Sequence, residues 1–277
     1  FLYFVNLIKA YRLKFLLSNY KTKKFKFYLK LPLIRQFVNS TFFGNLGEFV
    51  MPFILKKNLK VTYVEGFSIT VVERFLDLSL ISLIFGICLF FNDLNIYKNL
   101  INLYFIIFFI CIFLTLYVMR TKNSFLTKIK LIKYFQKGFY NSFKRNKHLL
   151  NIVLLTILIW VFFIIIDLII FNAFEVTKKI SSLPNVIFIT GVIILSQFIP
   201  AAPSSIGIFN YLVIEAINQF YIINNLAFSL QTQAELTSIS MIILLIYILP
   251  DITWGGYLFF KEAALNLKNL KFIKLSK

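Results

Sequence analysis

The stretch FFGNLGEFVMPFILKKNLKVTYVEGFSITVVERFLDL, residues 42–78, decides the fold of this chain. Apolar residues dominate it, yet Glu48, Glu73, Arg74 and Asp77 lie among them. A charged side chain at the centre of a bilayer costs roughly 2.5–3.5 kcal/mol on insertion scales. We therefore treat these four residues as candidates for a functional role.

Two glycines, Gly44 and Gly47, interrupt the same stretch. Backbone that leaves helical geometry at membrane depth has to be buried in protein or to line a wet cavity. The interruption therefore predicts a polar pocket, with the neighbouring carboxylate of Glu48 at its floor. An alternative role for Glu48 is to cap the half-helix that starts here, because a negative charge is favoured at a helix N-terminus.

The composition indicates the class of protein. Of the 277 residues, 59% are hydrophobic, against roughly 45–50% in soluble domains. Continuous apolar runs at 100–118, 149–171 and 238–249 with its flanks have the length of membrane spans. Strands of membrane barrels instead alternate apolar and polar residues over about ten positions. We predict an all-α, polytopic helical membrane protein that forms a single membrane domain over residues 1–277.

The basic residues indicate topology. The net charge of +19 arises between apolar spans, as the positive-inside rule requires, and so does not indicate nucleic-acid binding. Residues 120–147 contain nine basic residues and no acidic ones, which predicts a cytoplasmic loop. Residues 9–30 are expected to form a loop or short amphipathic helix on an anionic leaflet, and residues 261–277 a cytoplasmic tail. The predicted location is the plasma membrane of a prokaryote. Because Phe1 lies inside an apolar segment, we expect a fragment that lacks the first helices.

The first half is predicted to form a broken hairpin and a full span within residues 31–91. Residues 31–43 and 46–55 are each shorter than the roughly 20 residues that cross a bilayer. Basic residues, among them Arg35, flank the pair on both sides. A re-entrant hairpin that enters from the cytoplasmic side satisfies both observations. The alternative is one ordinary helix with a flexible middle. Residues 66–91 then leave the cytoplasm as a span.

A second broken hairpin and span are predicted within residues 185–249. Its break at residues 200–207 contains two prolines and a glycine, which one straight helix cannot accommodate without losing backbone hydrogen bonds. Pro250 is expected to kink or end the span that follows. In the preceding span, residues 149–171, Asp167 lies near the outer end and is expected to reach water.

The two halves match in outline but run in opposite directions. Gly47 leads to Glu73 at nearly the same interval as Gly207 leads to Glu235. Counting spans from the basic loops puts the mouth of the first hairpin inside and that of the second outside. This pattern is typical of inverted repeats, whose substrate site lies near the midplane between facing broken helices.

The charged residues of the first span allow two interpretations. Glu73 and Asp77 share one helix face, and Arg74 lies three residues from Asp77. These three can form a local ion pair that neutralises itself and holds helices together. Alternatively, Arg74 clamps a lipid phosphate, which suits guanidinium geometry, while Glu48 and Glu73 hold the arginine or recognise a cationic headgroup. We expect loss of Arg74 to destabilise the fold more than neutralisation of Glu73, since an unpaired buried guanidinium cannot shed its charge.

Three motifs resemble one family: NSTFFGNLGE at residues 39–48, VERFLD at residues 72–77, and PAAPSSIG at residues 200–207. They are similar to motifs of the lysylphosphatidylglycerol synthase transmembrane region, a flippase-like family of membrane proteins. Ser204 and Ser205 replace glycines of the family pattern. Together with the repeat, which adds Glu235, these motifs predict a lipid-binding site made of Glu48, Glu73, Arg74, Asp77, Asn45, Gly47, Ser204, Ser205, Gly207 and Glu235.

The resemblance implies a lipid-handling protein that translocates a modified phospholipid or glycolipid headgroup between leaflets. The expected partner is an anionic phospholipid or a modified lipid. The alternative function is a non-catalytic membrane subunit or anchor for a separate lipid-modifying synthase or glycosyltransferase. We expect no enzymatic activity, no metal and no cofactor, because the chain lacks the motifs of acyl-transfer and zinc chemistry. The sequence leaves the oligomeric state open.

Overall fold

The computed structural model describes residues 2–42, 45–91, 106, 109, 110, 113, 130–143, 148–198 and 203–262. These residues form helices and connecting turns, and none of them belongs to a strand. The all-α prediction is thus confirmed over the described part of the chain. Gly44, most of the predicted span at 100–118 and the predicted tail beyond Glu262 lie outside the described residues.

The first half contains α1 (Leu2–Leu16), α2 (Phe25–Thr41), α3 (Gly47–Leu59) and α4 (Tyr63–Phe91). The predicted break is confirmed, because α2 ends at Thr41 and α3 begins at Gly47. Both arms are longer than the sequence indicated.

The backbone leaves helical geometry at Asn45, between the two arms. Asn45 has a φ of 55°, in the left-handed region that β-carbon-bearing residues rarely adopt. Gly47 lies so close to α2 that a β-carbon there would collide with the carbonyl oxygen of Arg35. The absence of a side chain at Gly47 therefore allows α3 to start directly against α2.

The second half contains α7 (Leu149–Ala173), α8 (Glu175–Lys178), α9 (Leu183–Phe198), α10 (Ile208–Ile223) and α11 (Leu230–Pro250). The predicted second break is also confirmed. A short 3₁₀ turn, η3 (Pro203–Ser205), lies between α9 and α10. The left-handed φ angles of Ser204, Ser205 and Gly207 are 56°, 54° and 91°.

The α-helical geometry of α11 ends at Pro250, as the sequence allowed, but the helical segment does not stop there. A π-helical turn, η4 (Asp251–Gly255), follows, and helical residues continue to Glu262. A π turn accommodates the proline, which cannot donate a backbone hydrogen bond. It packs against α2, where a β-carbon on Gly255 would meet the carbonyl oxygen of Leu33.

Among the described residues, three helical segments are long and apolar enough to cross a membrane: Leu149–Ala173, Pro203–Ile223 and Leu230–Glu262. The 29-residue helix α4 is about 44 Å long at 1.5 Å per residue. Within the basic segment 120–147, residues Lys130–Phe143 form the amphipathic helix α6, which packs on α4 through the buried Phe139.

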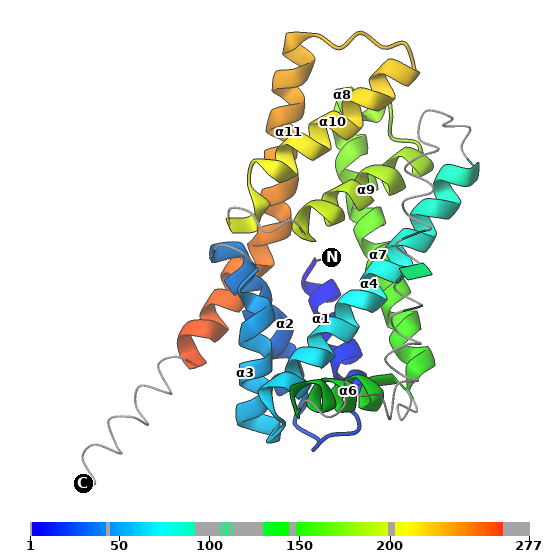
Figure 1. The fold of residues 1–277 in the computed structure, drawn as a ribbon. Coiled ribbons are helices and arrows are strands. Elements are labelled where there is room, and N and C mark those ends of the chain that lie inside the picture. Colours follow the sequence, from blue (N-terminus) through cyan, green and yellow to red (C-terminus); the bar gives the residue numbers. More distant parts are fainter. Residues whose placement is uncertain are drawn as a thin grey trace.

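The two broken hairpins meet at their breaks. In Figure 1, α2 and α3 occupy the lower half of the bundle and α9 and α10 the upper half, while α7 and α11 run beside both. The hydroxyl of Ser204 in the second break donates a hydrogen bond of 3.0 Å to the carbonyl oxygen of Ser40, close to the end of α2. The entry of each hairpin from its own side of a bilayer stays a prediction.

We predict that cysteines at positions 40 and 204 will cross-link with a short thiol-reactive linker when Cys88 and Cys111 are replaced by serine. The two residues are in contact, so the reaction is expected in the folded membrane-bound chain and not after denaturation. A pair at positions 40 and 235 serves as the control. Absence of cross-linking at 40 and 204 would show that the breaks do not face each other.

Candidate functional site

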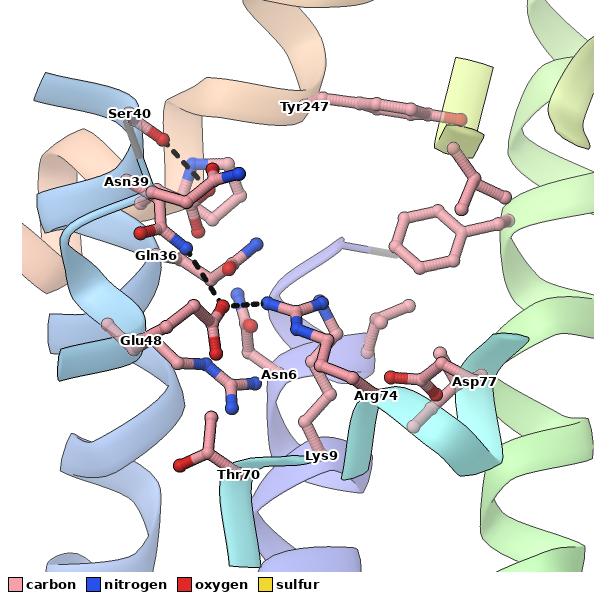
Figure 2. A pocket seen from close by; sticks show the side chains of 18 of the residues that line it. Asn6, Lys9, Gln36, Asn39, Ser40, Glu48, Thr70, Arg74, Asp77 and Tyr247 are labelled. Carbon is pink, nitrogen blue, oxygen red and sulfur yellow. Dashed lines mark hydrogen bonds and ion pairs between the residues drawn. The ribbon is translucent and has the colours of Figure 1, made fainter. Parts of the chain in front are cut away.

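A cavity of about 430 Å³ lies where the two breaks meet α1, α4, α7 and α11. Figure 2 shows charged side chains reaching into it from several helices. Besides apolar residues, its lining contains these polar and charged ones: Asn6, Lys9, Arg12, Arg35, Gln36, Asn39, Ser40, Asn45, Glu48, Thr70, Arg74, Asp77, Ser204, Ser205, Tyr247 and Asp251.

Arg12 of α1 forms one wall of the cavity with two carboxylates of α4. Its guanidinium makes a two-pronged ion pair with Asp77 and donates to Glu73 Oε1 at 3.0 Å. It also donates to the hydroxyl of Thr156 on α7 at 3.3 Å. The Arg12 side chain is only 1% exposed. One guanidinium thus joins three helices, with the forked geometry that makes arginine–carboxylate pairs strong.

Arg35 of α2 pairs with the other oxygen of the same carboxylate. Arg35 Nη1 lies 2.5 Å from Glu73 Oε2, and both side chains are buried. Glu73 therefore bridges two arginines that lie far apart in the sequence. Removing one partner from a buried ion pair costs about 3–5 kcal/mol, because it leaves an uncompensated charge.

Arg74 pairs with Glu48 across the gap between α4 and α3. The Arg74 side chain is 31% exposed and that of Glu48 is 17% exposed, so this pair faces the cavity. Asn39 supports it: its amide nitrogen donates to Glu48 at 3.3 Å, and its amide oxygen accepts the N–H of Gly47 at 2.7 Å. Figure 2 shows the chain of contacts from Asn39 through Glu48 to Arg74. The predicted proximity of Glu48 and Arg74 is confirmed.

The proposed local ion pair between Arg74 and Asp77 is wrong. Residues three apart on a helix can meet, but here each charge has a partner on another helix: Arg74 has Glu48 and Asp77 has Arg12. Contacts between helices replace the local pair because they neutralise groups that would otherwise be buried without a counter-charge.

The structure brings most of the predicted site residues together. Asn45, Ser204 and Ser205 line the cavity with Glu48, Arg74 and Asp77, and Glu73 and Gly47 lie directly behind its wall. Gly207 sits outside the lining and lets the chain turn into α10. Glu235 is exposed on α11, where it accepts a hydrogen bond from Gln231 at 3.3 Å, so it does not belong to this site.

Asp167 does not reach water as expected. It is fully buried and accepts hydrogen bonds from Tyr247 at 2.6 Å and Thr190 at 2.7 Å. Since Tyr247 lines the cavity, these contacts connect α7, α9 and α11 at its upper wall. Two hydroxyl donors make it possible to bury a carboxyl group that would otherwise be left without partners.

The sequence missed Lys9, Arg12 and Arg35, which it assigned to basic loops and flanks. α1 continues through this region and buries Arg12 within the bundle. One signal was available: Ile8, Arg12 and Leu16 are spaced four residues apart and so share one face of a helix. An arginine among apolar residues on one helix face indicates a buried ion pair and not a surface loop.

The fold and the cavity define a polytopic helical membrane protein with a charged chamber between two broken helices. The chain belongs to the family described as the lysylphosphatidylglycerol synthase TM region, whose sequence profile it matches over residues 1–230. This confirms the resemblance drawn from the three motifs. Comparison with curated proteins and with solved structures gave no match.

From the sequence, loss of Arg74 was expected to destabilise the fold more than neutralisation of Glu73. The ion-pair partners of these two residues predict the opposite order. We predict that Glu73→Gln will lower the unfolding temperature in detergent more than Arg74→Gln, because Glu73 neutralises two buried arginines while Arg74 faces the cavity. The matched control is Glu235→Gln, an exposed position, which should leave the unfolding temperature unchanged. A larger loss in Arg74→Gln would contradict this assignment of partners.

Proposed function

We propose that this protein moves the headgroup of a phospholipid or modified lipid between the leaflets of its membrane. The observation that carries the proposal is the charged cavity between two facing helix breaks. A polar headgroup pays a large desolvation penalty in hydrocarbon, and a chamber with charged walls inside the bundle lowers this barrier. Membership of a family named for a lipid synthase supports lipid as the substrate.

The polar groups of the cavity suit a ligand that both accepts and donates hydrogen bonds. Among the described residues that line it, buried N–H groups of Arg12, Arg35 and Trp160 have no acceptor. The buried oxygens Asn6 Oδ1 and Glu48 Oε2 have no donor. A phosphodiester that carries a hydroxylated or amino headgroup offers acceptors and donors in one molecule.

The helices that start at the two breaks also favour an anionic ligand. α3 begins at Gly47, next to Glu48 of the lining, and α10 begins at Ile208, three residues after Ser205 of the lining. The N-terminal end of a helix carries a partial positive charge, and broken helices in transporters use it to hold anionic groups of a substrate. The volume of about 430 Å³ falls within the range of about 300–1,000 Å³ typical of ligand pockets.

The alternative function is a membrane anchor for a separate lipid-modifying enzyme, and one feature favours it. Helix α6 lies across one end of the bundle in Figure 1 and presents Lys133 and Lys137 on its exposed side. A basic surface of this kind can bind an acidic partner or an anionic leaflet. An anchor does not have to move a headgroup across the membrane, so a measurement of lipid transport distinguishes the two functions.

We predict that the intact chain in proteoliposomes will speed the exposure of a fluorescent phospholipid to an external quenching reductant. Arg74→Ala should slow this exposure at least about tenfold, the effect of raising a barrier by about 1.4 kcal/mol. Thermal unfolding in detergent confirms that the variant is folded. Glu235→Gln, outside the cavity, should keep full activity. If the intact chain does not accelerate exposure over protein-free vesicles, or the folded Arg74→Ala variant is as active, the anchor is favoured.

A further inference from the structure

We propose that Lys9 is the phosphate-binding residue of the cavity, and that the three arginines around it hold the framework. This inference rests on the proposed function for the source of the phosphate, a lipid headgroup. It differs from the sequence interpretation, in which Arg74 clamps the phosphate.

The terminal nitrogens of the cavity's arginines contact carboxylates, while the buried Nε–H groups of Arg12 and Arg35 have no acceptor among the described residues. Each arginine has at least one ion-pair partner within the described part of the chain: Arg12 with Glu73 and Asp77, Arg35 with Glu73, and Arg74 with Glu48. A guanidinium that neutralises a buried carboxylate cannot be diverted to a ligand without leaving that carboxylate buried alone. The arginines therefore set the shape and charge balance of the walls.

Lys9 differs from them. It lines the cavity from α1, and no hydrogen bond or ion pair joins its Nζ atom to the residues that the structure describes. Its Nζ atom lies over the ring of Phe163, 5.3 Å from the ring centroid. An aromatic face stabilises an ammonium group moderately but supplies no hydrogen-bond acceptor. All three N–H donors of Lys9 are thus open to a ligand.

The surroundings of Lys9 favour an acceptor-rich ligand. Trp160 packs on Phe163 with ring centroids 5.6 Å apart, and its buried N–H has no acceptor among the described residues. Asn6 lies three residues before Lys9, on the same helix face, and also lines the cavity. Figure 2 shows Asn6 and Lys9 rising from α1 beneath the pair formed by Glu48 and Arg74. A phosphate group is rich in acceptor oxygens, and a lysine binds it as a compact point charge.

A competing role for Lys9 is to balance Asp251, which lines the same cavity. Asp251 accepts only a long hydrogen bond of 3.5 Å from Ser40, and no ion pair to it is formed by the described residues. Lys9 and Asp251 thus line the same cavity without forming an ion pair. This arrangement leaves the ammonium available to a ligand, and it defines the control that the experiment requires.

The test measures equilibrium binding of a fluorescent phosphatidylglycerol to the purified full chain in mixed micelles. Lys9→Met should weaken binding at least about tenfold, as expected when one charge-assisted hydrogen bond is lost. Lys9→Arg should largely retain it. Binding of a glycosyl diacylglycerol with the same acyl chains, which lacks phosphate, should be unaffected by Lys9→Met. Lys133→Met on the exposed side of α6 controls for general loss of positive charge.

The double variant Lys9→Met, Asp251→Asn separates phosphate binding from charge balance. If Lys9 binds phosphate, the double variant regains any lost thermal stability but not the affinity for phosphatidylglycerol. Recovery of that affinity, or unchanged binding in folded Lys9→Met, would overturn the inference.

Soluble competitors identify the source of the phosphate. Inorganic phosphate and glycerol phosphate should compete poorly with the lipid if the acyl chains contribute to binding. Lys9-dependent binding of glycerol phosphate without binding of the lipid would keep the phosphate site but overturn a lipid source. If only the proposed transport function is wrong, the chain will bind lipid in micelles through Lys9 but will not transport lipid in vesicles.

Discussion

The structure depends on the requirement that charge buried in a helical bundle be paired. Glu73 sits between Arg12 and Arg35, and Asp77 completes the neutralisation of Arg12. These ion pairs join α1, α2 and α4 in one wall of the cavity. Ionic contacts in a bundle of this kind restrict which helix faces can meet, because a shift of one helix along another would separate buried charges from their partners.

A second constraint comes from the backbone. Helices that break within the bundle expose N–H and C=O groups, and these have to be satisfied by protein or by a polar cavity. Asn39 provides one solution, since its amide oxygen accepts a hydrogen bond from the first N–H of α3 and its amide nitrogen donates one to Glu48. Ser204 provides another, since it joins the second break to α2. Breaks and charges therefore gather in one place, and the cavity is the result.

Much of the architecture could be predicted from patterns that are local in sequence. The apolar runs, the glycines near residue 45 and the prolines of the second break indicated membrane helices and two interruptions. The described residues contain both interruptions and the predicted helix at Leu149–Ala173. The prediction failed for charged residues, which can either lie at the surface or be buried with a partner. Arg12 and Arg35 were assigned to basic flanks because neighbouring lysines are basic, and Asp167 was assigned to water because it lies near a helix end. Burial of each depends on partners from other helices.

The sequence by itself determined the class of protein, the family, the positions of the breaks and a minority of the polar residues that line the cavity, because hydropathy, proline, glycine and short motifs act over a few neighbouring residues. Only the tertiary structure decided the pairing of charges. Spacing on one helix brings together residues three or four apart, whereas Arg12 reaches Glu73 and Asp77 across 61 and 65 positions. That long-range pairing leaves Lys9 as the lysine of the cavity that faces its interior without a bonded partner among the described residues.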